Sequence, residues 1–552
     1  MRRTEAGNGL TLTVYAGTTG THLAWDLDES LRDDLLGFAV KRFGGTYPHG
    51  VFLKGGITFP GQDHPPGFFL DTDVAPIQAF RWGDYAVYPG TRYRYEVIPM
   101  GGAPGALVAK PSVTVEVTTE WTYDFGSKHR IAFNRAVAAS QAFGRRFGDA
   151  DPTDNSLARQ WLGHGLDEFI GDFFERAAGE GWALDVSVYE YEQPEVRDVL
   201  QAAHERGVHV RVLYHAQPGD AQTTTNETNL KADGFARYMH ARVTTKICHD
   251  KTAVLSQLDG DHRTPIAVLT GSTNWTLNGL YYQANVSHVI DDPALAARYL
   301  ALFEQLWDGL DPEDTRTWID AQDPIAENDP IELLFSPRSG QNDLARYVSL
   351  IDGAERTVLF MTAFDLYDDV LSALAGETGN QGVLRWGLQN SASRVTGYDR
   401  THDRNFTARG SLRTAPKGFI PESSHGQDGS ILIHGKIILL DFDTANPTVI
   451  TGSANYSYSS SYSNDENALV IHGDARVADV YLCELFRWYD HYRFRYNVSQ
   501  ASKKPEELDT SSTEGTIEPR LELDTTPAWA DSYYEDGDPH FLERTRLAHP
   551  LT

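Results

Sequence analysis

The strongest constraint on this chain is a pattern of reactive side chains that occurs twice. ICHDKTAVL at 247–255 is followed by TGSTNW at 270–275, and IHGKIILLD at 433–441 is followed by TGSANY at 451–456. A single His-x-Lys sequence is most often accidental, and Gly-Ser-x-Asn alone is ordinary turn chemistry. Two copies in matched order predict two related halves that build one shared site.

The segments around each copy alternate between strand-like and helix-like patterns. In the first half, strand-like sequences at 183–191 and 208–216 flank a helical pattern at 195–207, and residues 155–177 also have helical spacing. In the second half, strand-like sequences at 357–364 and 382–390 flank a helical pattern near 368–376. This order is typical of βαβ units, so we expect two tandem α/β halves, each an α-β-α sandwich, at 123–325 and 326–500.

The two ends of the chain differ from the α/β halves in composition and in residue pattern. Residues 1–122 contain β-forming runs at 35–43, 93–99 and 112–117 between Gly- and Pro-rich segments, which predicts an all-β sandwich. PGTRYRYEVIPM at 89–100 resembles the late strand of a fibronectin type III domain. Residues 501–552 are polar and acidic, and we expect an extension that wraps the surface or is partly disordered.

Charge limits the choice of ligand. The chain has 77 acidic and 48 basic residues and a formal net charge of −29, which repels nucleic acid and anionic membranes. An anionic substrate therefore needs a local positive site. Two cysteines exclude a disulfide framework, and neither a secretory signal pattern nor a long apolar run is present. We expect a cytoplasmic protein, while secretion of a mature form stays open.

The repeated residues have the chemistry that a phosphodiester requires. One neutral imidazole, from His249 or His434, can attack phosphorus while the other protonates the leaving oxygen. The charge that grows on the phosphoryl oxygens can be held by two lysines and two asparagines, namely Lys251, Lys436, Asn274 and Asn455. No metal or cofactor is needed. The His-x-Lys spacing suits a β-strand, on which residues two apart share a face.

The doubled pattern resembles the HxK…D…GSxN signature of the phospholipase D superfamily, which includes phospholipases, cardiolipin-type synthases, nucleases and tyrosyl-DNA phosphodiesterases. The resemblance covers roughly residues 123–500 and implies a pseudo-twofold catalytic unit that forms a covalent phosphohistidine. It also assigns supporting roles to Ser272, Ser453, Asp441, Glu466 and Asn285. The first half departs from the signature, because Ser256 stands where the second half has Asp441.

The resemblance also implies different roles for the two histidines. In similar enzymes, the acid that follows one Gly-Ser-x-Asn reaches the histidine of the opposite half. Glu466 is therefore expected to orient His249, and Asn285 to face His434. A carboxylate stabilises the cation that forms during attack, so His249 is expected to be the nucleophile and His434 the general acid and base.

The sequence says less about the substrate than about the reaction. A basic loop at 394–417, including Arg404 and Arg409, is expected to bind a phosphate-rich ligand, and Arg237, Arg242 and Lys246 approach His249 in sequence. A phospholipid is the first hypothesis and includes peripheral membrane contact, although no exposed amphipathic helix is apparent. Two alternatives stay open: a nuclease or nucleic-acid end-processing enzyme, and a binding or regulatory protein with a retired site.

Overall fold

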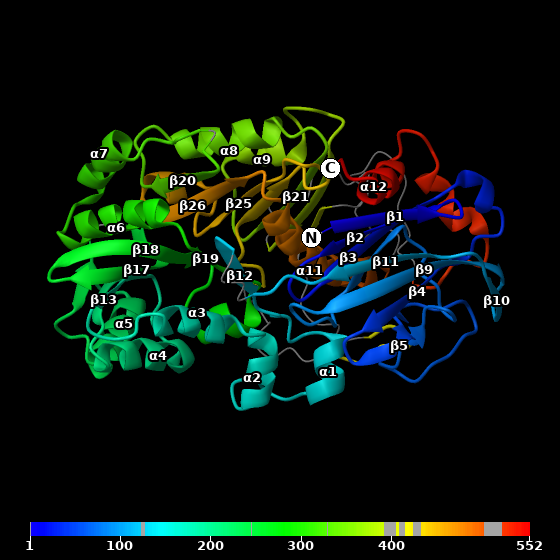
Figure 1. Cartoon of the computed structure of the whole chain (residues 1–552), viewed down its shortest axis with the longest axis horizontal. Helices are drawn as coiled ribbons and strands as arrows, with labels where there is room; N and C mark the ends of the chain where they lie inside the picture. The colour runs from blue at the N-terminus through cyan, green and yellow to red at the C-terminus, as the bar shows by residue number, and fades with distance from the viewer. Residues whose placement is uncertain are drawn as a thin grey trace.

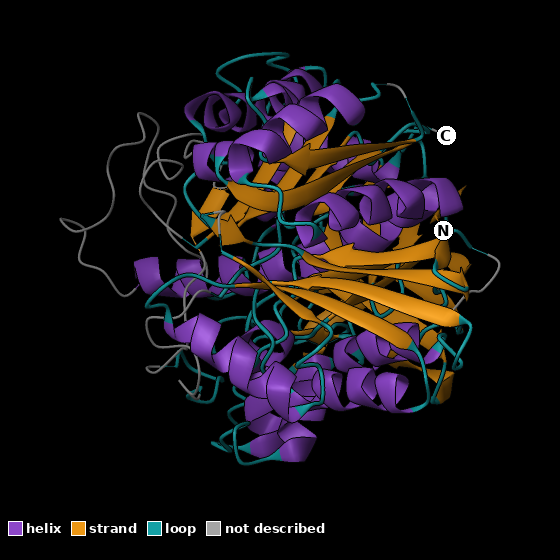
Figure 2. Cartoon of the chain, turned by 90° about the vertical axis from the view of Figure 1, so that its left-hand side faces the viewer, coloured by secondary structure: helices purple, strands orange, loops and turns teal. Residues whose placement is uncertain are grey.

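The computed structural model describes residues 2–122, 127–243, 246–327, 329–390, 405–407, 415–422, 432–501 and 521–551. In Figure 1, the N-terminal β-strands occupy one end of the molecule, and the two α/β halves lie side by side at the other. Figure 2 shows helices on the outside and sheets between them. Within the described ranges, no helix combines the length and apolar content needed to cross a bilayer.

The N-terminal part consists of antiparallel sheets. One contains β1 (Arg2–Gly7), β2 (Leu10–Ala16), β3 (Thr21–Leu27) and β8 (Arg81–Asp84). The other contains β4 (Gly37–Gly44), β5 (Tyr47–Phe52), β9 (Arg92–Ala103), β10 (Ala106–Ala109) and β11 (Val113–Thr118). Short elements complete it: η1 (Glu29–Leu31), β6 (Lys54–Gly55) and β7 (Leu70–Asp71). Apolar side chains of both main sheets share one core. The β-rich prediction is confirmed, whereas the fibronectin type III likeness stays a prediction.

The first half is built on a mixed sheet. Its strand order is β12 (His129–Phe133), β19 (Val286–Ile290), β18 (His262–Gly271), β17 (Lys251–Asp259), β13 (Trp182–Val188), β14 (His209–His215) and β15 (Met239–Arg242). Strands β13 and β14 are parallel and are joined by α4 (Pro194–Glu205), which confirms the predicted βαβ unit. Helices α3 (Leu166–Glu175) and α4 cover one face and α6 (Pro293–Trp307) covers the other (Figure 1). The remaining helices are α1 (Gln141–Phe147), α2 (Ser156–Gly163), α5 (Ala221–Ala232), η2 (Asn278–Tyr282) and α7 (Pro312–Gln322).

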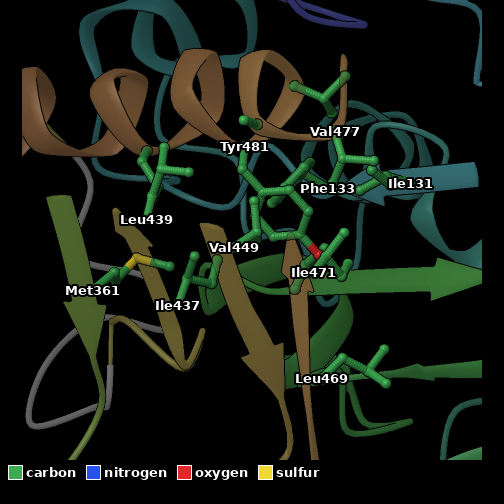
Figure 3. Packing of buried hydrophobic residues seen from close by; sticks show 14 of the residues in the cluster. Ile131, Phe133, Met361, Ile437, Leu439, Val449, Leu469, Ile471, Val477 and Tyr481 are labelled. Carbon is green, nitrogen blue, oxygen red and sulfur yellow. The ribbon is translucent and has the colours of Figure 1, made fainter. Parts of the chain in front are cut away.

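The second half repeats this plan. Its sheet contains β20 (Ile331–Ser336), β21 (Thr357–Thr362), β22 (Leu384–Gln389), β23 (Asn405–Thr407), β24 (Ile437–Leu440), β25 (Thr448–Gly452) and β26 (Asn464–His472). Helices α8 (Asn342–Asp352) and α9 (Asp368–Ala375) cover one face, while α10 (Tyr458–Tyr462) lies beside β26. On the other face, α11 (Ala475–Ala501) places Val477 and Tyr481 against strand side chains such as Leu439 and Val449 (Figure 3).

The two halves are joined through their sheets and their cores. Strand β16 (Ile247–Cys248) comes from the first half but pairs in parallel with β26 of the second. Residues of β12, α6 and α11 also belong to one continuous apolar cluster, and Figure 3 shows Ile131 and Phe133 beside Tyr481. The two copies of the reactive pattern therefore lie at a packed junction between the two sheets.

The structure adds detail to two sequence predictions. The helical pattern at 155–177 forms α2 and α3 rather than one helix, because His164 and Gly165 adopt left-handed conformations with φ of 55° and 86°. In the C-terminal extension, η6 (Pro527–Tyr533) and α12 (Pro539–Ala548) pack on the N-terminal sheets, with Trp529 in the shared core. The proposed domain boundaries stay predictions.

Candidate active site

His249 and His434 face each other at the junction between the halves. His249 lies in the turn between β16 and β17, and His434 lies shortly before β24. Their ring centroids are 6.3 Å apart, and the planes are inclined at 69°. Each backbone N–H is bound by the opposite half: that of His249 donates to Asp465 O at 2.9 Å, and that of His434 to Ala284 O at 3.1 Å. The interface between the halves therefore sets the position of both imidazoles.

The His-x-Lys spacing predicted that both segments lie inside strands. They do not, and these backbone bonds explain why. Lys251 is the first residue of β17, and Lys436 immediately precedes β24. The backbone N–H groups of both histidines donate across the junction and not within their own sheets. Regular strand pairing therefore begins only at or after each lysine. The two ammonium groups then turn back and donate to the carbonyl of their own histidine, Lys251 at 2.5 Å and Lys436 at 2.6 Å.

The Nδ1 atoms of the two rings have different partners. Nδ1 of His249 lies 2.9 Å from a carboxylate oxygen of Glu466. Nδ1 of His434 lies 3.0 Å from Ser272 O and 3.1 Å from the side-chain oxygen of Asn285. The family resemblance implied these contacts of Glu466 and Asn285 across the junction. Because the oxygens of Glu466 and Ser272 accept a hydrogen bond from Nδ1–H, Nε2 is the nitrogen left for chemistry in each ring.

The Gly-Ser-x-Asn segments have the same construction in both halves. Gly271 and Gly452 have φ of 141° and 148°, and a Cβ at either position would lie 2.3 Å from a carbonyl oxygen of the neighbouring strand. Only glycine allows this approach. The hydroxyl of Ser272 accepts from the N–H of Val286 at 3.2 Å and donates to Asn285 at 2.8 Å, and that of Ser453 accepts from the N–H of Asn467 at 3.1 Å. Both serines thus have supporting positions.

The asparagines that end these segments have unused polar atoms. The side-chain oxygens of Asn274 and Asn455 are buried and have no hydrogen-bond partner among the described residues. Buried polar groups in native proteins are almost always paired, and an exception at a candidate site calls for an explanation. Each of these oxygens can accept a hydrogen bond from a ligand or from water, whereas only the amide nitrogens of the two asparagines can donate to a phosphoryl oxygen.

Burial and the two lysines control the charges at this site. Burial first, and then the charges of Lys251 and Lys436, lower the pKa of His249 and of His434 well below the ordinary value, so both imidazoles are neutral in the free protein. Burial lowers the pKa of Lys251 to about 8 and that of Lys436 well below its ordinary value. Burial also raises the pKa of Glu466 to about 7.

Asp441 has a structural environment. With φ of 48°, it turns the chain after β24, and its carboxylate accepts from the N–H groups of Glu355, Arg356 and Thr357 at 2.7 to 3.1 Å. In the first half, Ser256 lies within β17 where the register with β18 shifts. The first half therefore has no counterpart of the Asp441 carboxylate, which binds the backbone at the start of β21 in the second half.

Sequence reasoning did not identify the aromatic side chains beside the histidines. The ring of Tyr189 lies 5.3 Å from that of His249, and Nζ of Lys251 lies 5.2 Å from the Tyr189 ring centroid. Phe364 lies 6.0 Å from His434, and Nζ of Lys436 lies 5.7 Å from the Phe364 ring. Both aromatics follow a parallel strand, β13 or β21. The carboxyl ends of such strands commonly bear ligand sites, and this was the signal available in the sequence.

The predicted basic residues have varied positions. Arg404 and Arg409 lie outside the described residues. Arg242 is not at the reaction centre, because its guanidinium is buried in an ion pair with Asp465 at 2.8 Å. Nζ of Lys246 is 3.1 Å from the hydroxyl of Ser459, across the junction. Over the part of the chain that the structure describes, no three His, Cys, Asp or Glu side chains converge as a metal site would require.

Comparisons with known proteins agree with this arrangement. A family model described as "Cardiolipin synthase, PLD-like domain" matches residues 181–307 and 347–488. A mitochondrial cardiolipin hydrolase of Xenopus laevis is 30% identical over 138 residues, which are 24% of this chain and 57% of that protein. The same-named protein of Canis lupus familiaris is 22% identical over 231 residues, or 40% of this chain and 84% of that protein.

Among solved structures, a phosphatidylserine synthase of Haemophilus influenzae gives a TM-score of 0.41 at 12% identity and covers 62% of this chain and 89% of that chain. The chain spans only 51% to 57% of the length of the first curated relatives that it matches. Each of the two family-model matches contains one His-x-Lys and one Gly-Ser-x-Asn sequence, both of which lie at the junction described above. The two family-model matches, one PLD-like segment in each half, support membership of this chain in the phospholipase D superfamily.

Proposed function

We propose that the protein is a phosphodiesterase that acts on phospholipids through a covalent phosphohistidine. The observation that carries this proposal is the pair of neutral imidazoles from opposite halves, 6.3 Å apart and accompanied by two lysines. That separation leaves room for one phosphoryl group between the two rings, so that attack and departure can take place on opposite sides of phosphorus.

In the first step, the Nε2 lone pair of His249 forms a bond to phosphorus. The bond from phosphorus to the leaving oxygen breaks, and that oxygen takes a proton from Nε2 of His434. His434 is neutral in the free protein, but the negative charge of a bound phosphodiester raises its pKa and favours the protonated ring. Glu466 stabilises the positive charge that develops on His249.

In the second step, water replaces the histidine. His434, now neutral, takes a proton from the water as its oxygen bonds to phosphorus, and the bond from phosphorus to Nε2 of His249 breaks. An alcohol in place of water would give a transfer reaction. During both steps, Lys251, Lys436, Asn274 and Asn455 are placed to hold the phosphoryl oxygens.

Phospholipid is proposed as the substrate because the curated relatives are named cardiolipin hydrolases and the family model is named for cardiolipin synthase. A peripheral encounter with a lipid surface belongs to this proposal, as does a cytoplasmic location. We also propose an N-terminal β-sandwich over 1–122, two catalytic halves over 123–325 and 326–500, and an extension over 501–552.

The test is a set of parallel assays on one enzyme preparation. The substrates are vesicles of phosphatidylcholine, vesicles containing cardiolipin, single-stranded DNA and bis-(p-nitrophenyl) phosphate, each with and without a chelator. We expect lipid head-group release and chromogenic turnover that the chelator leaves unchanged, because lysines supply the charge that metals supply elsewhere. Cleavage of DNA without cleavage of lipid would replace the proposed substrate, and activity restored only by a divalent ion would contradict the mechanism.

A further inference from the structure

The backbone of the turn that contains His249 is held from two opposite sides. The N–H of His249 donates to Asp465 O in β26 of the second half at 2.9 Å. Successive N–H groups of an extended segment point in opposite directions. The N–H of Cys248 therefore points back into the first half, where it donates to Nδ1 of His215 at 3.2 Å. His215 is the last residue of β14 and is only 2% exposed, so a buried side chain holds this turn in its own half.

This hydrogen bond determines which nitrogen of His215 carries the ring hydrogen. A backbone N–H can only donate, so Nδ1 of His215 has a free lone pair and the hydrogen lies on Nε2. Nε2 lies 3.2 Å from one carboxylate oxygen of Asp220, and the other oxygen accepts from the N–H of Gln222 at the start of α5. Burial lowers the pKa of His215 despite the opposing charge of Asp220, so the ring is neutral at neutral pH.

Helix α5 also holds the ends of the two strands beside this ring. The side-chain amide of Asn226 donates to Tyr189 O at 2.9 Å and to His215 O at 3.1 Å. The ring centroid of Tyr189 lies 5.1 Å from that of His215 and 5.3 Å from that of His249. His215 is therefore fixed by α5 and packs against the same aromatic ring that contacts His249.

The second half contains the same bond with a different side chain. The N–H of Ile433, directly before the other reactive histidine, donates to Oδ1 of Asn390 at 2.8 Å. Tyr214 and Gln389 pair with the ends of β13 and β21, and the next residues are His215 and Asn390, so these two occupy equivalent positions. Nδ1 of histidine and Oδ1 of asparagine are both bonded to Cγ. The feature that recurs is thus an acceptor at one distance from the backbone, and not an imidazole.

We propose that His215 is a positioning residue of this site: its Nδ1 atom, by accepting the N–H of Cys248, holds the backbone of His249 so that Nε2 of His249 meets phosphorus. This inference rests on the proposed phosphodiesterase function. It adds a residue that touches neither the substrate nor the reacting atoms. Because a displacement of about 1 Å at a reacting atom can lower a rate by about 10²-fold, one backbone bond beside the nucleophile is enough to matter.

The test uses two substitutions that separate the two nitrogens of His215. His215→Asn keeps an acceptor bonded to Cγ, as Asn390 has, whereas His215→Gln places its amide near Asp220 and has no acceptor on Cγ. Both remove the ring from beside Tyr189, so the lost packing affects both. With bis-(p-nitrophenyl) phosphate, we expect kcat to fall about 10-fold to 100-fold in His215→Gln and to stay within about fivefold of wild type in His215→Asn.

The Michaelis constant and a control variant complete the kinetic test. KM should stay within about threefold of wild type in both His215 variants, because the lysines and asparagines that hold the diester are unchanged. His209→Gln makes the same substitution at the start of β14, away from the turn, and should keep kcat within about twofold of wild type. Equal kcat values in His215→Asn and His215→Gln would overturn the inference.

Amide hydrogen exchange at Cys248 reads the bond without turnover. Mass spectrometry of a peptide that contains the turn should show exchange about tenfold faster in His215→Gln than in wild type or His215→Asn. Equal exchange in the three proteins would also overturn the inference. If wild-type protein hydrolysed no phosphodiester while exchange still separated the two variants, the proposed function would fail and the assignment of His215 to the turn would stand.

Discussion

At the scale of single residues, the two histidines differ mainly in which group accepts the hydrogen bond from Nδ1–H. His249 has the carboxylate of Glu466, while His434 has the uncharged oxygens of Ser272 and Asn285. A carboxylate stabilises an imidazolium more than a carbonyl does, so the ring that becomes positively charged when bonded to phosphorus should be His249. The ring with neutral partners can release a proton more readily.

This asymmetry predicts where a covalent intermediate accumulates. Both His249→Ala and His434→Ala should lower kcat for phosphatidylcholine by roughly 10³ or more, because each removes a bond-forming or proton-transfer role, with little change in melting temperature. A p-nitrophenyl leaving group departs without protonation, so His434→Ala quenched during turnover should carry a phosphoryl adduct on His249, which mass spectrometry can locate. An adduct on His434 in His249→Ala, with none on His249 in the reciprocal variant, would reverse the two roles.

The pKa values predict a narrow pH optimum. Below about pH 7, Glu466 becomes protonated and cannot stabilise the His249 cation, so kcat/KM should fall as the pH falls. Above about pH 8, Lys251 loses its charge, so kcat/KM should fall again as the pH rises. Glu466→Gln should remove the acid limb and retain the alkaline one; an acid limb that persists would belong to another group, such as Glu190 or Asp250, whose pKa burial also raises to about 7.

At the scale of elements, the site depends on strands that pair across the halves. β16 pairs with β26, and the N–H of Lys246 donates to Ser463 O at 3.2 Å. The guanidinium of Arg242, at the end of β15, is buried against the carboxylate of Asp465 in β26. Since the backbone of Asp465 also binds His249, the ion pair helps to fix the catalytic turn.

Asp465→Asn should therefore lower the unfolding free energy. It leaves the buried Arg242 cation without its counter-charge, and we expect a loss of about 3–5 kcal/mol in unfolding free energy. Glu116→Gln is a matched control, because it makes the same chemical change in the exposed pair with Arg92 and should cost less than about 1 kcal/mol. Urea unfolding of both variants measures the difference. Similar losses in the two variants would mean that the pair does not hold the halves together.

The same elements show what the sequence could predict. The repeated pattern identified both histidines and both lysines, because these residues occur at fixed spacings along the chain, and the family resemblance implied the role of Glu466 across the junction. The βαβ order followed from local patterns of apolar residues. The strand assignment of His-x-Lys was wrong because the bonds that end the strand come from Asp465 and Ala284, which are distant in sequence. Tyr189 and Phe364 were missed for a related reason, since no repeated spacing marks a residue that reaches the site only through folding.

At the scale of the whole molecule, the C-terminal segment connects parts that are distant in sequence. Nε1 of Trp529 donates to Leu35 O at 2.9 Å, and the Tyr15 hydroxyl donates to Leu547 O at 2.9 Å, so η6 and α12 are attached to the N-terminal sheets. The N–H of Leu551 donates to Asp443 O at 2.8 Å in the second half. The C-terminal extension thus contains elements that attach the β-rich part to the catalytic part.

Trp529→Ala tests this role. Trp529 is buried and lies 5.7 Å from the ring of Phe80 and 6.3 Å from that of Phe38, so its removal leaves a cavity in the N-terminal core and should cost about 3–5 kcal/mol. Tyr88→Ala is the control, because Tyr88 is 60% exposed and its loss should cost much less. Thermal unfolding should show a lower first transition in Trp529→Ala only. Below that transition, kcat should stay within about twofold of wild type, since the reacting groups belong to other cores. If Trp529→Ala instead lost activity below that transition, the C-terminal segment would directly support the histidine junction.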